Sequence, residues 1–292
     1  MEVNSVLEQS FKKWLQTLGY AESTVYNSII YVRAFLKWLE LQQITKLNQI
    51  TKSIIKSYHN HLQTRKNKLF AGSLSQNYIT SNINALKRFS KYLNETGKGH
   101  LEIDIQHERA TPATRIILTK QEIQKLYKAC GNDYLGIRDR TMLNIYYGCG
   151  LRRSEGIGLN VSDILLKEKL VHVRQGKGYK ERYVPITETL KEELENYIYV
   201  ARKQIQSFKP EKQESLFLSM RAKRMCGNAM LERVHKLAEN ANIQKETGLH
   251  ILRHSIATHL LQSGMTLEEV SRFLGHSSLE STQIYTHLAN EI

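Results

Sequence analysis

The chain has 292 residues, of which 41% are hydrophobic and 24% charged, and it carries a formal net charge of +14. This composition excludes a disordered chain, and the length favours two domains. The excess of lysine and arginine favours a polyanionic partner such as nucleic acid, although a solvated basic surface accounts for it equally well. No apolar run approaches the ~18 residues of a membrane span, so we expect a cytoplasmic protein that makes no membrane contact.

Residues 1–96 are predicted to be helical throughout and to form one domain. Apolar spacing predicts helices over about 3–18, 23–39, 51–64 and 75–94. The last of these has an apolar stripe and an opposite, donor-rich face, on which four polar residues recur: Asn77, Ser81, Asn84 and Arg88. Taken alone, this face is more typical of a solvated surface than of a binding site.

Helical periodicity stops over residues 97–116, which hold two glycines and a proline and are predicted to be a linker. A second domain is predicted over 117–292, opening with a capping box of Thr119 and Glu122. Two alternating segments predict strands at 169–175 and 181–187, joined through GKGY. Further helices are predicted over about 134–148, 188–206, 227–241, 249–263, 266–274 and 278–288. The fold class is mainly α with a small sheet.

The segment HILRH brings His250, Arg253 and His254 together. The two histidines have the spacing of a helical zinc pair, but the segment lacks the glutamate of HExxH, and Arg253 would repel a cation. The three cysteines show no CxxC pairing and are expected to be reduced thiols in or near the core. We therefore expect no metal. On a helix, His250 and Arg253 share one face and suit a phosphate, while His254 points away.

A phosphate undergoing transfer needs more positive charge than one arginine supplies. Arg152 in GLRRSE and Lys177 in QGKGYK are candidates, although such segments are more often a salt-bridged helix start and a solvated turn. Tyr285 is a candidate nucleophile, although most of the fifteen tyrosines must serve packing. Gly275 can end one helix and allow the next to bring Tyr285 back towards His276.

Five segments in this order, GLRRSE, GKGYKERYVPI, HILRHSIATHLL, LGHSS and TQIYTH, resemble the catalytic signature of the tyrosine recombinases. The likeness is closest to the Xer-type and phage or transposon integrase branch and spans about 115–288. It implies a helical, SAM-like core-binding domain, followed by a mostly helical catalytic domain with a small antiparallel sheet. Together they would form a C-shaped clamp around double-stranded DNA.

The resemblance also implies a role for each matching residue, without metal, ATP or another cofactor. Tyr285 would attack the scissile phosphate and keep a 3′-phosphotyrosyl bond, while Arg152 and Arg253 hold the non-bridging oxygens. Lys177 would protonate the leaving 5′-oxygen, His250 would assist proton transfer with the tyrosine, and His276 would orient the phosphate. In this family a helix of the first domain lies in the major groove, which makes the polar face at 75–94 a candidate DNA-reading surface.

Two positions depart from the family pattern. Gly156 stands where the family usually has a leucine, which bears on local helix packing. The sequence ends seven residues after Tyr285, where relatives often continue into a helix that docks on a neighbouring subunit.

The function implied is site-specific strand exchange by a homotetramer on paired DNA sites, in integration, excision or dimer resolution, with the need for accessory proteins left open. A nicking and resealing enzyme of the topoisomerase IB type would share the phosphate chemistry. A DNA-binding regulator that has lost catalysis is the third alternative, and the complete set of six candidate residues argues against it.

Overall fold

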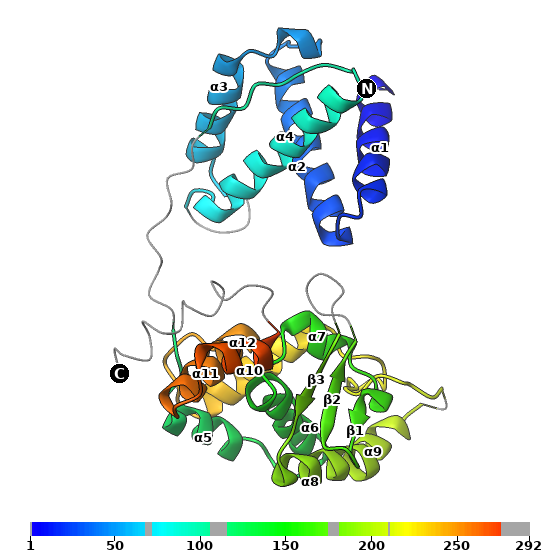
Figure 1. Cartoon of the computed structure of the whole chain (residues 1–292), viewed down its shortest axis with the longest axis vertical. Coiled ribbons are helices and arrows are strands. Elements are labelled where there is room, and N and C mark those ends of the chain that lie inside the picture. Colours follow the sequence, from blue (N-terminus) through cyan, green and yellow to red (C-terminus); the bar gives the residue numbers. More distant parts are fainter. Residues whose placement is uncertain (1, 68–71, 106–115, 175–180, 210, 276–292) are drawn as a thin grey trace. The chain divides into compact units, whose positions relative to one another are not determined.

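A computed structural model describes residues 2–67, 72–105, 116–174, 181–209 and 211–275. The chain divides into two compact units, Met1–Ala113 and Thr114–Ile292, which are drawn with their elements in Figure 1. This division falls inside the range expected to be a linker. Across the described ranges, no helix is both long and apolar enough to cross a membrane.

The N-terminal unit is helical, and its helices pack around one core. They are α1 (Glu2–Thr17), α2 (Glu22–Leu41), the 3-10 turn η1 (Leu47–Gln49), α3 (Lys52–Thr64) and α4 (Gln76–Glu95). α2 lies against both α1 and α4. The core is rich in aromatic rings, among which Phe11 contacts both Phe89 and Tyr92 at centroid distances of 5.2 and 5.3 Å. Val6 and Leu18 also fit the apolar spacing of the first predicted helix, but they are exposed at 66% and 50%. Fewer residues of this segment are therefore buried than its apolar spacing indicates.

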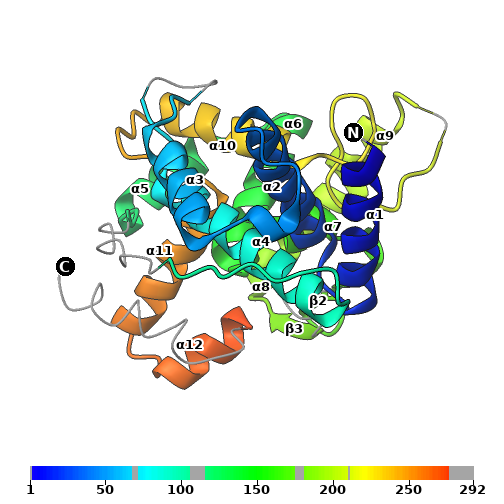
Figure 2. The same cartoon turned by 90° about the horizontal axis from the view of Figure 1, so that it is seen from above.

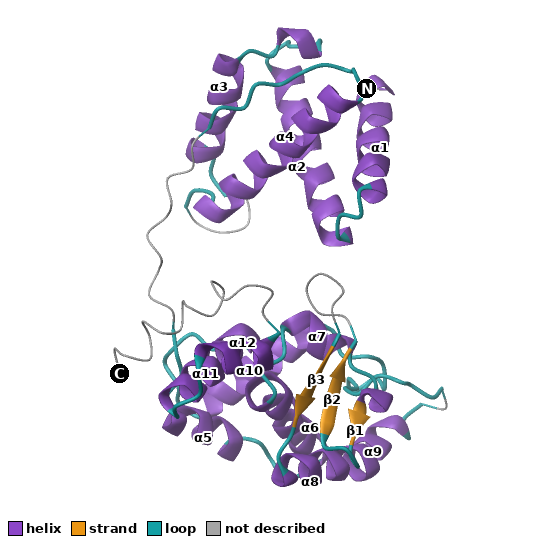
Figure 3. Cartoon of the chain, viewed as in Figure 1, coloured by secondary structure: helices purple, strands orange, loops and turns teal. Residues whose placement is uncertain are grey.

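The C-terminal unit contains most of the helices and the sheet (Figure 3). Its first half comprises α5 (Lys120–Lys128), α6 (Tyr134–Leu143), the π turn η2 (Asn144–Gly148), α7 (Arg153–Gly158), the 3-10 turn η3 (Val161–Asp163), β1 (Ile164–Leu165), β2 (Leu170–Val173) and β3 (Arg182–Pro185). Its second half comprises α8 (Glu188–Asn196), the π turn η4 (Tyr197–Ala201), α9 (Arg202–Gln206), α10 (Gly227–Asn240), α11 (Leu249–Gln262) and α12 (Leu267–Leu274).

The three strands form one antiparallel sheet in the order β1-β2-β3. β2 and β3 pair from Leu170 opposite Pro185 to Val173 opposite Arg182. In this sheet Val171 and Val184 are fully buried, whereas Tyr183 is half exposed. Such alternation is typical of a sheet with one face on the core and the other in solvent. The mostly helical fold with a small antiparallel sheet is confirmed, and the short strand β1 is an addition to it.

Local signals account for where several elements begin. Thr119 accepts a hydrogen bond from the Glu122 amide at 3.1 Å, and Glu122 accepts one from the Thr119 amide at 2.7 Å, which is the expected capping box. The helix predicted over 134–148 continues past α6 as the π turn η2, which periodicity did not indicate.

Cys130 and Cys149 are buried, but Cys226 is exposed, so the expectation that all three thiols lie in or near the core is wrong for Cys226.

Candidate active site

Arg152 lies at the start of α7 and is held from two sides. Its Nη1 donates to Glu155 Oε1 at 2.8 Å, and its backbone N–H donates to Glu155 Oε2 at 2.8 Å. Its Nη2 donates to the carbonyl of Gly275 at 3.0 Å. The segment GLRRSE is therefore a salt-bridged helix start, as its pattern suggested, and this pairing at the same time fixes the direction of the candidate catalytic guanidinium.

Arg253 reaches the same place from α11. The residue is only 3% exposed, and its guanidinium donates to the carbonyl of Gly150 and, at 2.8 Å, to that of Leu274. Its Nη1 lies 3.9 Å from Glu155 Oε2. The structure thus brings together two arginines that are a hundred residues apart in the sequence, around one carboxylate and one helix end.

The carboxylate of Glu155 and the guanidinium of Arg182 were not among the candidates drawn from the sequence. Arg182, on β3, donates from Nη1 and Nη2 to the two oxygens of Glu155, both at 2.9 Å. Burial favours the neutral form of Glu155, but the hydrogen bonds and charge of Arg182, and then those of Arg152, lower its pKa to about 2. Glu155 is therefore an anion that three guanidinium groups surround.

The end of α12 completes this arrangement. Gly275 ends the helix in the left-handed conformation, with φ of 65°, which glycine adopts at little cost. The carbonyls of Leu274 and Gly275 accept from Arg253 and Arg152, so the last carbonyls of α12 meet the positive charges that its dipole favours. Both Figure 1 and Figure 2 show α12 beside α11, the helix that carries Arg253.

His250 lies one turn before Arg253 on α11, as the i, i+3 spacing predicts. Partial desolvation of its ring lowers its pKa, and the positive charges of Arg253, Arg153 and Arg152 lower it further. The lowered pKa favours the neutral imidazole of His250, which can accept a proton. The side chain is exposed, which leaves it accessible to an incoming substrate.

Three predicted site residues, Lys177, His276 and Tyr285, lie outside the described residues. Gly275, the residue before His276, is described, and Val173 and Arg182 are the paired residues nearest to Lys177 on β2 and β3. Within the described ranges, no group of three or more histidine, cysteine, aspartate or glutamate side chains could hold a metal ion.

The four predicted DNA-reading residues lie along α4 at the spacing of one helix face. Asn77, Ser81 and Asn84 are exposed, and Arg88 is partly buried. Three of them line a hollow of about 180 Å³ between α4 and α2, whose lining is Thr24, Asn27, Ser28, Tyr31, Ser81, Asn84 and Arg88. Asn77 is not part of it. Arg88 Nη1 lies 3.5 Å from Ser28 Oγ, and its guanidinium is 5.8 Å from the centroid of the Tyr20 ring.

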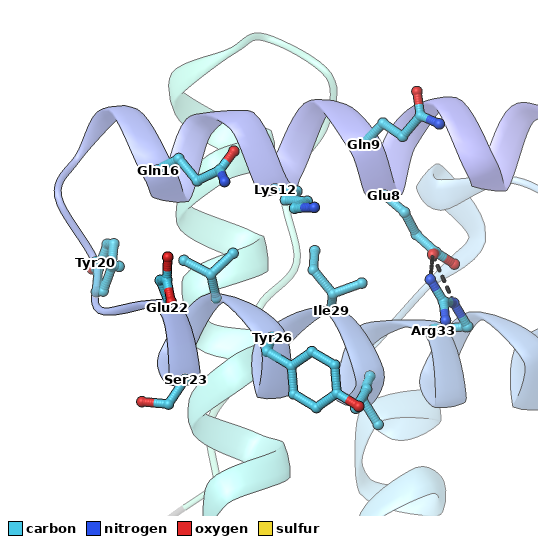
Figure 4. A pocket seen from close by; sticks show the side chains of 12 residues that line it. Glu8, Gln9, Lys12, Gln16, Tyr20, Glu22, Ser23, Tyr26, Ile29 and Arg33 are labelled. Atoms are coloured by element: carbon cyan, nitrogen blue, oxygen red, sulfur yellow. Dashed lines mark hydrogen bonds and ion pairs between the residues drawn. The ribbon is translucent and has the colours of Figure 1, made fainter. Parts of the chain in front are cut away.

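No local sequence pattern indicates the α2 side of this polar hollow, because Thr24, Asn27, Ser28 and Tyr31 form no motif of their own. A second hollow, of about 700 Å³, lies between α1 and α2. In Figure 4 it is flanked by Lys12 and Gln16 of α1 and by Tyr26 and Ile29 of α2, with the ion pair of Glu8 and Arg33, 2.7 Å long, at one side. The two hollows therefore lie on different sides of α2, one lined also by residues of α4 and the other by residues of α1.

The sequence matches the phage integrase family over residues 116–291, a range that contains all six candidate catalytic residues. The chain belongs to this family. It is similar to tyrosine recombinase XerC 2 of Ralstonia nicotianae, with 32% identity covering 98% of this chain and 82% of the relative. It is also similar to tyrosine recombinase XerD of Proteus mirabilis, with 33% identity covering 99% and 91%. The protein is a site-specific recombinase of the tyrosine class.

Solved structures of recombinases share the fold of this family member. The crystal structure of XerA recombinase has 27% identity and a TM-score of 0.54, covering 96% of this chain and 93% of that one. XerH recombinase, bound to its difH substrate before cleavage, has a TM-score of 0.69 at 21% identity, covering 99% and 83%. The Tn1549 transposon integrase, in complex with transposon right-end DNA, has a TM-score of 0.70 at 17% identity, covering 96% and 94%.

The departure at Gly156 has a packing reason in this recombinase. A Cβ atom on Gly156 would lie 2.5 Å from the Tyr146 hydroxyl and 2.6 Å from its ring carbon Cζ. Tyr146 is fully buried, and its hydroxyl donates to the Arg153 carbonyl at 3.3 Å and lies 3.0 Å from Met230 Sδ. The Tyr146 ring therefore occupies the space that a side chain at position 156 would need, just beyond Arg152.

Proposed function

We propose that this recombinase cleaves and rejoins double-stranded DNA through a 3′-phosphotyrosyl bond on Tyr285. The observation that carries the proposal is the convergence of Arg152 and Arg253, from α7 and α11, on Glu155 and on the end of α12. Two guanidinium groups fixed side by side suit the two non-bridging oxygens of one phosphodiester. Charge and hydrogen bonding would hold the phosphate here, and the proposed chemistry needs no cofactor.

Arg152 has donors left for a phosphate. A guanidinium carries five N–H donors, and among the described residues the Arg152 side chain spends one on Glu155 and one on Gly275. Its side chain is 21% exposed, while that of Glu155 is 1% exposed. An incoming phosphate would therefore meet the outer edge of Arg152, and the buried carboxylate would stay behind it.

The proposed steps divide the proton transfers among the remaining residues. The Tyr285 hydroxyl attacks phosphorus and passes its proton to neutral His250, while the 5′-oxygen leaves and takes a proton from Lys177. His276 would hydrogen-bond the phosphate. Attack by the 5′-hydroxyl of another strand on the phosphotyrosine then reverses these steps, restores Tyr285 and joins the exchanged strands.

The polar hollow between α2 and α4 is the proposed base-reading surface. Ser81, Asn84 and Arg88 would contact base edges, with Asn27 of α2 as a further amide. Asn77 lies near the start of α4, where Ser81 donates to its carbonyl at 2.8 Å, and would contact the groove from outside the hollow. XerH recombinase and the Tn1549 integrase, which share this fold, are bound to DNA in their solved structures, which supports DNA as the partner here.

We also propose that the active assembly is a homotetramer on two paired DNA sites, acting in the cytoplasm. Strand exchange needs four cleavable strand positions, and one chain supplies one Tyr285. Integration, excision and dimer resolution all use this chemistry and differ in where the two sites lie. A topoisomerase-like enzyme would instead reseal the same strand and would need no second site.

One substitution tests the proposed nucleophile. Wild-type protein mixed with a pool of nicked duplexes should yield covalent protein–DNA adducts, captured under denaturing conditions, and Tyr285→Phe should yield none while retaining DNA binding. Undiminished adduct from Tyr285→Phe would move the nucleophile to another residue. Products that join strands of two differently labelled duplexes would support strand exchange, and only relaxed or resealed starting duplex would favour the topoisomerase alternative.

A further inference from the structure

Among the described residues, Arg182 contacts both residues that hold the Arg152 side chain, Glu155 and Gly275. Its two Nη atoms bind the two oxygens of Glu155 at 2.9 Å. On its other side, a Cβ atom on Gly275 would lie 2.6 Å from Arg182 Cδ and 2.8 Å from its Nε. The side chain therefore packs directly against the backbone of Gly275, whose carbonyl accepts from Arg152.

The charges around Glu155 explain why its contact with Arg182 affects Arg152. Glu155 also accepts two hydrogen bonds from Arg152 and lies 3.9 Å from Arg253. A buried carboxylate needs a counter-charge and needs its lone pairs satisfied. With Arg182 absent, Arg152 and Arg253 would have to supply that counter-charge themselves, and their guanidinium groups would be drawn towards Glu155 and away from a phosphate.

The location of Arg182 in the chain adds a second link. It lies on β3, paired with Val173 of β2, and these two residues flank the connection that carries Lys177. At its far end it contacts α7 through Glu155 and the end of α12 through Gly275. One side chain thus joins the strand after Lys177, the helix start at Arg152 and the residue before His276.

We propose that Arg182 is a positioning residue for strand cleavage, which holds Arg152 in register by binding Glu155 and by packing under Gly275. It touches no DNA itself. The inference rests on the proposed function, because it assumes that Arg152 holds the scissile phosphate. A lysine would keep the charge but lose the two-pronged contact, since an ammonium group cannot bind both carboxylate oxygens in one plane.

The test compares Arg182→Lys with wild type in single-turnover cleavage of a nicked duplex, with protein in saturating excess so that the rate is free of affinity. We expect DNA affinity to change by less than about threefold and the cleavage rate to fall about 100-fold, the effect of a misplacement of ~1 Å. Arg233→Lys is the matched control, because Arg233 also donates from Nε and Nη2 to a buried carboxylate, that of Asp139. It should cleave like wild type.

A second comparison separates positioning from folding. If Arg182 acts through Glu155, the double variant Arg182→Gln with Glu155→Gln should cleave no more slowly than the slower of its two single variants, because both remove the same contact. The double variant also leaves no buried carboxylate without its Arg182 partner, so it can be measured even if Arg182→Lys does not fold. Multiplying losses in the double variant would overturn the inference.

Two further outcomes would also overturn it. One is an Arg182→Lys cleavage rate within threefold of wild type, and the other is a loss of DNA affinity with an unchanged saturating rate, which would make Arg182 a DNA contact. Failure of the proposed function would look different, because wild-type protein itself would then form no adduct, or Tyr285→Phe would still form one.

Discussion

Glu155 carries its negative charge in the interior of the C-terminal unit, where three guanidinium groups stabilise it. Its pKa of about 2 in the folded protein lies below the ordinary value of 4.5. A depressed carboxyl pKa stabilises the fold fully above the unfolded value, and this stabilisation is lost as pH falls through the folded value. The relevant window is therefore pH 4.5 down to 2, and the shift corresponds to at most about 3 kcal/mol.

We expect the free energy of unfolding of wild type to exceed that of Glu155→Gln at pH 7, and the gap to narrow as the buffer is taken from pH 4.5 towards 2. Urea unfolding followed by far-ultraviolet circular dichroism measures it. The exposed Glu168 offers a control substitution to glutamine, which should leave the pH dependence as in wild type. A gap that stays constant over this range would show that the Glu155 charge does not stabilise the fold.

At this scale the sequence predicted some of the site and missed the rest for a physical reason. Arg152, His250 and Arg253 belong to short motifs whose residue types suit a phosphate, and the structure brings the two arginines to one place. Arg182 forms its contact with a glutamate 27 positions earlier in the chain, and no local pattern encodes that pairing. Glu155 did have a signal, because a side-chain acceptor three residues after a helix start indicates a cap.

Among the elements, α2 and α4 form the proposed DNA-reading surface. Arg88→Ala should cost about 1–3 kcal/mol in binding to the cognate site and relax preference at one base pair, if its guanidinium reads a base edge. A phosphate contact would instead weaken all sequences about equally and reduce the salt dependence. Binding curves for cognate and scrambled duplexes at two salt concentrations distinguish these results.

Arg33 provides the control for this experiment. It lies on the other side of α2, paired with Glu8 at the hollow shown in Figure 4, so Arg33→Ala removes one positive charge from the same unit without touching the polar hollow. Its effect on cognate and scrambled DNA should be equal and small. If Arg88→Ala behaves in the same way, the polar face of α4 is a solvated surface.

Most described helices of both units followed from apolar spacing and caps, because they bury apolar residues against their neighbours, but α7 was not predicted and the helix predicted over 278–288 lies outside the described residues. Irregular features did not. The π turn η2 inserts a residue into a helix whose periodicity looks continuous, and β1 is only two residues long, Ile164–Leu165. Whether Ser28 or Ser81 faces a hollow depends on how α2 and α4 pack together, which a single helical pattern does not specify.

In the whole molecule, each unit has a hydrophobic core of its own. Both tryptophans of the chain, Trp14 and Trp38, pack against the core of the N-terminal unit. Tryptophan fluorescence should therefore report the unfolding of that unit alone, whereas circular dichroism reports both. Glu155→Gln should move the circular dichroism transition at pH 7 and leave the fluorescence midpoint in urea unchanged.

A fragment of residues 1–105 offers a second measurement. If the core around Trp14 and Trp38 suffices, the fragment should unfold cooperatively with nearly the fluorescence midpoint of the full chain. A fluorescence midpoint that shifts together with Glu155→Gln, or a fragment without a cooperative transition, would contradict the independence of the two units.

Because of the π turn at Asn144–Gly148, the position of the Arg152 side chain depends on the number of residues in this turn as well as on their identity. The Cys149 amide donates to the Asn144 carbonyl at 2.9 Å, five positions back, so the turn holds one residue more than an α-turn. Deleting one residue there would restore a regular helix and rotate everything after it by about 100°. The Gly150 carbonyl would then turn away from Arg253. Exchanges that keep the length would leave this count intact, so deleting a residue of this stretch should displace Arg152 more than substituting the same residue would.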